Sequence, residues 1–394
     1  MRSVALLVLV SCLISSCRLR DERATESPAA SRSGLPGDRL ERILADRFDP
    51  QRRSRALGRL LAETDPADAV ELQIRLTAAS PYAHPSDLEQ FAWWWAGHDP
   101  VAAMQSPVAT STVSIDFWQT QVLRAWAARD PAAASEGWKA GLCQGAQDYC
   151  LLALVAGWSD SGDGSVWNFV RDLGPGVLQQ RALDVLAARL VADRGIEEAL
   201  RFAEATDADA PHRFKLQLFR RMVTAIALRD VERAASWAER QSGGPFGDGL
   251  LRRVAVRWVT QEGSAGMTWL MSLPTGPQRD DAVQAAAYRW FQSDRAAALG
   301  WFEAAEDHPA LEPAWPTFAQ VLVEEDPARA LAVVGRIDDP DQRDRTLVTV
   351  LRRWRERSPE SAEDWLARQA LPESIVARVR AESPQPGSRS PRDR

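Results

Sequence analysis

The sequence predicts an all-α fold, an α-solenoid of about ten helix-turn-helix repeats of about 32 residues each. Ten segments align on a helix-cap residue, at intervals of 31 to 35 residues that settle at 32 in the last five segments. A large apolar residue stands four positions before every cap, and a small residue stands four positions after almost every cap. The caps are Asp65, Asp99, Asp130, Gly162, Gly195, Asp230, Glu262, Asp294, Asp326 and Ser358.

Each repeat is expected to contain two helices, A and B, that meet at the cap. An Asp or Ser side chain accepts hydrogen bonds from the free amides of the first turn, and a proline at the next position needs no amide there. Helix A therefore ends just after its large apolar residue, and helix B begins at the cap. Proline follows the cap directly in five repeats, as Pro66, Pro100, Pro131, Pro327 and Pro359.

One unbroken helix per repeat is the alternative, because Trp354 and Trp365 are 11 residues apart and would share a face of such a helix. Pro359 would then stand inside that helix, where a proline costs ~3 kcal/mol. We therefore favour two helices in each repeat.

The N-terminus has the pattern of a targeting segment, with Arg2 followed by the apolar run 4–14. This run is too short to span a membrane stably. With Ile14-Ser15-Ser16-Cys17 at its end, the segment resembles the signal of bacterial lipoproteins and its lipobox. The resemblance implies cleavage before Cys17 and lipid on its thiol and new amino terminus. A second lipobox ending at Cys12 and an ordinary secretory signal remain alternatives. Because Arg18 rather than Asp follows Cys17, the resemblance implies the periplasmic face of the outer membrane if the cell is Gram-negative.

The chain is accordingly divided into four parts. Residues 1–16 are the expected lipoprotein signal peptide, and residues 17–37 hold the lipidated Cys and a flexible linker rich in Ser, Arg, Ala and Pro. The repeats fill residues 38–381, and residues 382–394 form a proline-containing tail that is expected to be disordered.

Composition and charge exclude some classes of function. The chain has 394 residues, of which 45% are hydrophobic and 26% charged, and its net charge is -6. This composition is that of an ordinary soluble protein. The arginines are spread among acidic residues along the chain, and no basic stripe of the kind that nucleic acid requires is evident. We therefore expect no nucleic-acid partner.

The repeat resembles the tetratricopeptide (TPR) repeat over residues 50–372. A small residue in helix B with an aromatic one turn later carries the likeness best in two segments, Ser293 to Trp301 and Arg229 to Trp237. The period is shorter than the 34 residues of the family, whose Gly and Tyr in helix A are not regularly present. The resemblance implies a TPR-like superhelix. Eleven of the 16 tryptophans occupy repeat positions and are expected to pack in the core: Trp95, Trp126, Trp138, Trp158, Trp237, Trp258, Trp269, Trp290, Trp301, Trp354 and Trp365.

Trp93 and Trp94 are the candidates for ligand binding. They belong to the densest aromatic run of the chain. A predicted capping box, Ser86 to Glu89, begins the helix that carries this run. Helical geometry places Trp93 nearly opposite the apolar face, and Trp94 to its side. An exposed indole there would suit a peptide or a glycan. Alternatively, helix A buries more than one face between its neighbours.

Cys143 and Cys150 are candidates for a disulfide, which an oxidising periplasm allows. On one continuous helix their Cα atoms would lie ~10 Å apart, beyond the ~7 Å limit, so the bond requires a turn between them. Free buried thiols are the alternative. The spacing of a redox pair is absent.

No pattern indicates catalysis, a cofactor or a metal. The four histidines lie far apart, as His84, His98, His212 and His308, and neither a phosphate-binding glycine loop nor a serine nucleophile elbow is present. We therefore expect a membrane-anchored, non-catalytic protein-interaction scaffold of the bacterial cell envelope, with a protein partner. The alternatives are a glycan- or peptidoglycan-binding protein that uses exposed tryptophans and, with less support, an enzyme acting on the cell wall.

Overall fold

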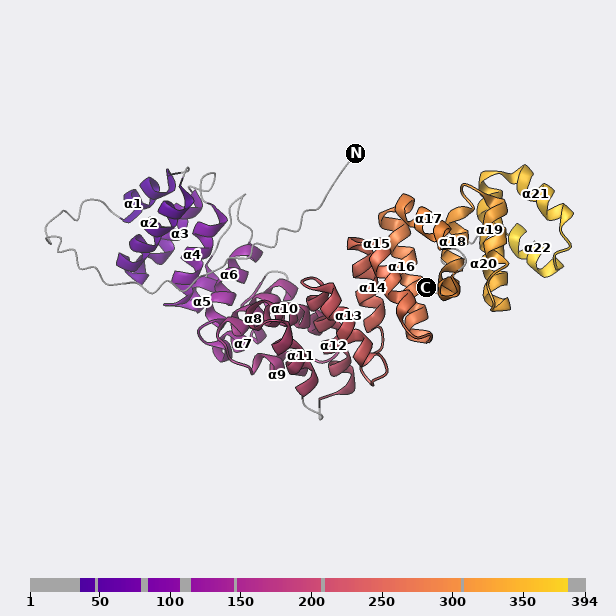
Figure 1. Ribbon diagram of the computed structural model, residues 1–394. Coiled ribbons are helices and arrows are strands. Elements are labelled where there is room, and N and C mark those ends of the chain that lie inside the picture. The colour runs from indigo at the N-terminus through magenta and orange to yellow at the C-terminus, as the bar shows by residue number, and fades with distance from the viewer. Residues whose placement is uncertain are drawn as a thin grey trace, which may run out of the picture. The chain divides into compact units, whose positions relative to one another are not determined.

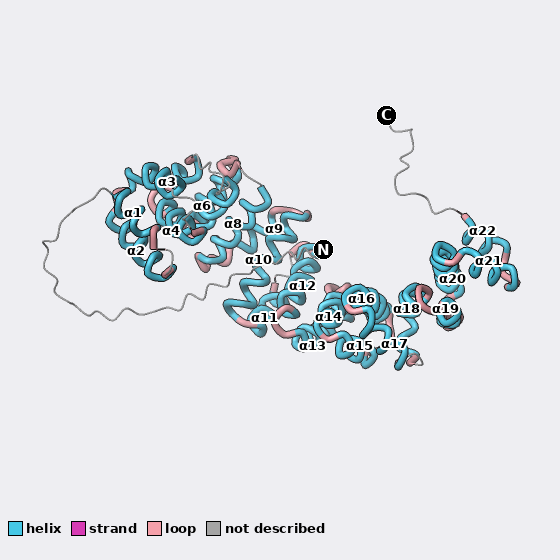
Figure 2. Tube along the Cα trace, turned by 90° about the horizontal axis from the view of Figure 1, so that it is seen from above, coloured by secondary structure: helices cyan, strands magenta, loops and turns pink. Residues whose placement is uncertain are grey.

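The computed structural model describes residues 36–46, 49–78, 84–106, 115–144, 147–206, 210–305 and 308–381. These residues form 22 α-helices and two short 3-10 helices, without a strand, so the predicted all-α fold is confirmed for them (Figure 2). The signal segment with Cys17 and the tail 382–394 lie outside the described residues. None of the described helices is both long and apolar enough to cross a membrane.

The chain divides into two compact units, with the boundary between Ala83 and His84. In the first unit, α1 packs on both α2 and α3. Its helix α1 begins inside the linker that the sequence predicts for residues 17–37. The elements of this unit are α1 (Pro36–Leu44), α2 (Pro50–Glu63), the 3-10 helix η1 (Pro66–Asp68) and α3 (Ala69–Ala78).

The second unit contains the remaining A and B helices, which alternate along the chain (Figure 1). Its A helices are α4 (Pro85–Ala96), α6 (Ile115–Ala127), α8 (Gln147–Asp160), α10 (Val177–Arg194), α12 (His212–Ala227), α14 (Leu250–Gln261), α16 (Pro277–Ser293), α18 (Trp315–Leu322) and α20 (Pro340–Arg357). Its B helices are α5 (Pro100–Gln105), α7 (Pro131–Lys139), α9 (Val166–Asp172), α11 (Ile196–Ala205), α13 (Val231–Ser242), α15 (Gly263–Ser272), α17 (Arg295–Ala304), α19 (Pro327–Val334) and α21 (Pro359–Arg368). The 3-10 helix η2 (Pro309–Ala314) precedes α18, and α22 (Glu373–Arg380) follows α21.

Contacts between helices in the second unit follow one rule. Each A helix packs on the B helix of its own hairpin and on the next A helix, from α4 and α6 through to α18 and α20. The final helix α22 packs on α20 in the same way. Nearly all packing is therefore between elements that are close in sequence.

Five aspartates end helix A and begin helix B as the sequence predicts. Their backbone N–H groups donate to the carbonyl four residues earlier, at 2.8 to 2.9 Å. Their carboxylates accept from the amide three residues later, at 2.9 to 3.1 Å. One residue thus closes one helix and caps the next. These residues are Asp99, Asp130, Asp230, Asp294 and Asp326.

The other predicted caps do not all follow this pattern, and Gly162 and Ser358 are examples. Gly162 is not the cap of α9, which begins only at Val166 with Ser165 as its N-cap. The reason is a local turn in which the carboxylate of Asp163 accepts from the amide of Ser165 at 2.9 Å. Ser358 does cap α21, but its side chain accepts no cap hydrogen bond.

The helix that carries Trp93 and Trp94 also begins earlier than predicted. His84, rather than Ser86, is the N-cap of α4, and Pro85 occupies the first helical position. The carboxylate of Asp87 accepts from the amide of His84 at 2.9 Å, which completes a capping box two residues before the expected one. The proline explains the shift, because its fixed φ suits the first position of a helix.

Aromatic side chains fill the space between the two helices of a hairpin. Tryptophans 11 residues apart meet across the turn, with ring centroids 5.3 Å apart for Trp258 and Trp269 and 5.6 Å apart for Trp290 and Trp301. All 16 tryptophans lie in the described residues, and none is exposed. Seven are buried: Trp95, Trp118, Trp126, Trp158, Trp237, Trp290 and Trp315.

Candidate functional site

The predicted binding residues Trp93 and Trp94 are both half-buried and are covered by neighbouring side chains. The guanidinium carbons of Arg124 and Arg129 lie over the Trp93 ring, 5.9 and 5.6 Å from its centroid. Trp94 stacks on Phe91 with ring centroids 5.7 Å apart. These contacts occupy ring surface that a peptide or a glycan would need.

Trp93 nevertheless has one unsatisfied group. Its indole Nε1–H is buried and has no hydrogen-bond partner. Since a buried unsatisfied donor costs about 1–3 kcal/mol, this atom weakens rather than strengthens the local packing. It points to no ligand, because the atom is closed off from solvent.

Cys143 and Cys150 are joined by a disulfide, with their Cα atoms 6.4 Å apart. They do not share one continuous helix, because α8 begins at Gln147, after Cys143. Both residues are only 1% exposed. The bond therefore connects the segment before α8 to the first turn of that helix, and it lies in the core.

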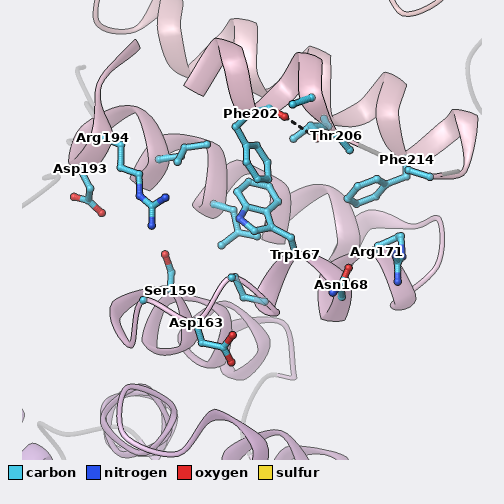
Figure 3. A pocket seen from close by; sticks show the side chains of 18 residues that line it. Ser159, Asp163, Trp167, Asn168, Arg171, Asp193, Arg194, Phe202, Thr206 and Phe214 are labelled. Atoms are coloured by element: carbon cyan, nitrogen blue, oxygen red, sulfur yellow. Dashed lines mark hydrogen bonds between the residues drawn. The ribbon is translucent and has the colours of Figure 1, made fainter. Parts of the chain in front are cut away.

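A cavity of about 590 Å³ lies between the hairpins of α8 with α9 and α10 with α11, and it extends to α12. Two aromatic side chains meet at its centre, where the ring of Trp167 lies 4.4 Å from that of Phe202 between centroids. Figure 3 shows these two rings side by side, with Asp193 and Arg194 toward one end of the cavity and Asn168 and Arg171 toward the other. The cavity thus has an aromatic floor and a charged rim, as ligand pockets commonly do.

The turn before α9 places Trp167 in this cavity. The carboxylate of Asp163 accepts from the Ser165 hydroxyl at 2.6 Å, from its amide at 2.9 Å and from the Trp158 indole at 3.1 Å. These bonds, the Ser165 hydroxyl first, lower the pKa of Asp163 below its ordinary value. Because the turn delays the start of α9 to Val166, Trp167 stands on the first turn of the helix and faces Phe202.

Sequence reasoning left Trp167 without a role. It falls between the small and the bulky position of its repeat, where the other repeats carry no tryptophan. That departure from the pattern was the one available signal, but position alone could not show which helix it would face.

A second cavity, of about 820 Å³, lies among α12, α14 and α16 and is lined by five arginines and two aspartates. Sequence reasoning missed this cluster because the arginines look scattered along the chain. A signal existed, since the arginines at 220 and 252, at 221 and 253, and at 257 and 289 are each 32 residues apart, which is the repeat period. The charged residues of this arginine cavity are Arg220, Arg252, Arg253, Arg257, Arg289, Asp248 and Asp281.

Neither cavity has the groups of a metal site. Within the described ranges, no cluster of three or more His, Cys, Asp or Glu side chains is placed to hold a metal ion. The lining of the Trp167 cavity contains neither histidine nor cysteine, and its charged side chains are two carboxylates and two guanidinium groups. Such a lining suits binding through apolar contact and hydrogen bonds.

Comparison with protein-family models, with curated proteins and with solved structures finds no match to this chain.

Proposed function

We propose that the protein is a non-catalytic scaffold whose helical hairpins form an α-solenoid similar to that of TPR proteins, and that it binds a protein partner. The support for the solenoid is the regular order of contacts, in which each A helix packs on its own B helix and on the next A helix. Proteins with this type of packing present extended surfaces made of successive repeats.

The observation that carries the proposal is the Trp167 cavity. Its aromatic floor matches an apolar side chain of a partner peptide, and its rim offers both signs of charge for the peptide groups beside that side chain. Phe214, at the edge of the floor, is 5% exposed and holds the shape of the cavity from α12. A preformed pocket of this kind lowers the entropic cost of binding.

The test uses a photo-crosslinking amino acid at Asn168, an exposed residue of the cavity rim, in living cells. We expect a protein adduct there that falls at least about five-fold when Ala205→Trp fills the cavity, because the partner side chain is then excluded. The matched control is Ala304→Trp, since Ala205 and Ala304 are both exposed and each ends a B helix. This control should leave the adduct unchanged.

Other outcomes of the same experiment would contradict the proposal. An adduct equally reduced by both tryptophan variants would place the contact outside the cavity. An adduct that resists protease but is released by a glycan-cleaving enzyme would show the alternative function, binding of cell-wall glycan.

We further propose that the scaffold is tethered in the cell envelope through lipid on Cys17, at the periplasmic face of the outer membrane. Several acyl chains together give a durable anchor, whereas one chain binds weakly. A tether of this kind would raise the local concentration of whatever the scaffold holds.

Labelling with an alkyne fatty acid tests the tether. We expect Cys17→Ser to lose the label and to release the protein from the membrane fraction, because the acceptor thiol is gone. The matched variant Cys12→Ser should keep both label and membrane association. The reverse pattern would assign the lipid to Cys12, and unlabelled wild-type protein would rule the anchor out.

A further inference from the structure

Ion pairs connect neighbouring A helices in the second unit. Arg181 on α10 pairs with Asp148 on α8 at 2.6 Å, and Arg221 on α12 pairs with Asp184 on α10 at 3.2 Å. Each pair is partly exposed, so its net contribution to stability is small. The pairs nonetheless show that these arginines of α10 and α12 each have a carboxylate partner on the preceding A helix.

At the arginine cavity there are fewer carboxylates than arginines, so some arginines have no acidic partner. Asp248 pairs with Arg220 and Asp281 pairs with Arg252. In the part of the chain that the structure describes, no ion pair joins Arg253, Arg257 or Arg289 to an acidic residue. The cavity lining therefore carries an excess of three positive charges over its negative ones.

Two of these guanidinium groups are poorly satisfied. The Nε–H of Arg257 is buried and has no hydrogen-bond partner. Arg289 donates to the hydroxyl of Thr260, a neutral acceptor, at 3.3 Å. The Arg257 Nε–H itself is closed off from solvent, so a ligand oxygen would meet the other N–H groups of these two guanidinium groups.

The free protein also bears repulsion at this site. Burial, followed by the charges of Arg221 and Arg220, lowers the pKa of Arg253 below its ordinary value, although Asp184 acts in the opposite direction. Arg253 and Arg257 are four residues apart on α14, where like charges destabilise a helix. A bound anion would offset the repulsion among these guanidinium groups.

We propose that the arginine cavity binds an acidic peptide segment, in which several Asp or Glu carboxylates pair with Arg253, Arg257 and Arg289. Guanidinium groups bind carboxylates through two parallel hydrogen bonds, which gives direction as well as affinity. The inference rests on the proposed function in one respect, that the ligand is a protein. The cavity and the chemistry of binding are different.

Size and spacing favour a peptide over a single small anion. The cavity, at about 820 Å³, is far larger than one phosphate ion needs. Its unpaired arginines stand on two successive repeats, Arg253 and Arg257 on α14 and Arg289 on α16. Positive charges spaced in this way match negative charges spaced along an extended chain.

The test measures the fluorescence anisotropy of labelled hexaglutamate with the purified full chain at low salt. We expect saturable binding, no binding of hexaglutamine, and a dissociation constant raised at least about ten-fold in the double variant Arg253→Gln/Arg257→Gln. The matched control Arg213→Gln/Arg378→Gln removes the same charge from exposed positions of α12 and α22. It should change the dissociation constant less than about two-fold. Thermal melting should show both double variants folded.

Three results would overturn the inference. Hexaglutamate that does not bind excludes the site, and equal weakening in the two double variants shows only diffuse charge attraction. Tighter, Arg253-dependent binding of tripolyphosphate would identify a phosphate ligand instead. Because Ala205→Trp blocks only the Trp167 cavity, an adduct at Asn168 without hexaglutamate binding contradicts this inference and leaves the proposed function intact.

Discussion

Replacing Trp290 with alanine is expected to lower the free energy of unfolding by about 3–5 kcal/mol. The Trp290 side chain is 5% exposed and packs on Trp301 and Phe302, with ring centroids 5.6 and 6.4 Å apart. It also fills the space over Gly263, where an added Cβ would fall only 1.9 Å from the indole Cε2. Its removal therefore leaves a cavity between α15, α16 and α17 that rigid helices cannot close.

Asp294→Ala provides the comparison within the same hairpin. The Asp294 carboxylate accepts from the amide of Ala297 at 3.1 Å, and loss of such a cap costs about 1 kcal/mol. Chemical denaturation followed by circular dichroism measures both variants. If Trp290→Ala proves no more destabilising than Asp294→Ala, the aromatic pairs do not hold the hairpins together.

Replacing Gly157 with alanine is expected to lower the free energy of unfolding by about 3 kcal/mol, at the upper end of the usual cost of overpacking. Gly157 lies in α8 where that helix crosses α6. A Cβ at this position would stand 2.1 Å from the carbonyl oxygen of Arg124 and 2.9 Å from the Cβ of Ala127. Because the first of these atoms belongs to the backbone, the two helices must move apart to admit a methyl group.

Gly300→Ala is the matched control, since it makes the same change inside α17. Nothing lies within 4 Å of a Cβ built at Gly300, and the residue is exposed. Alanine is a better helix former than glycine, so this variant should gain about 0.5–1 kcal/mol. Thermal melting of the two variants should give shifts of opposite sign. A lowered melting temperature in both would mean that the effect at Gly157 is not due to close helix packing.

Much of the helical hairpin pattern could be predicted from the residues. Asp99, Asp130, Asp230, Asp294 and Asp326 cap helices where the repeat pattern places them. A cap depends on a carboxylate and on amides within the next three residues, so its signal is local. The small residues four positions after the caps are buried, as the regular spacing predicts.

The exceptions arose where another local hydrogen bond competes with the expected one. Asp163 accepts from Ser165 and Trp158, and α9 therefore begins at Val166 instead of following Gly162. His84 takes the capping position ahead of Ser86 because Pro85 starts the helix. Repeat spacing alone does not show which of the two possible residues begins each helix.

The candidate sites were harder to predict than the hairpins. Trp93 and Trp94 stood out by their density, yet Arg124, Arg129 and Phe91 cover their rings. Trp167 did not stand out, yet it lines a cavity with Phe202. Which face of a ring stays exposed depends on the side chains of neighbouring helices. The rotamers of those side chains cannot be derived from the sequence.

Residue order alone was enough to establish the helical class, the position of most turns and the alternation of bulky and small side chains, since all three follow from interactions within a few residues. The two cavities emerged only from the folded arrangement. Phe202 comes to Trp167 from another hairpin, and Arg289 joins Arg253 across two A helices. A cavity is space that packed helices leave between them, so its shape and charge depend on how side chains distant in sequence meet.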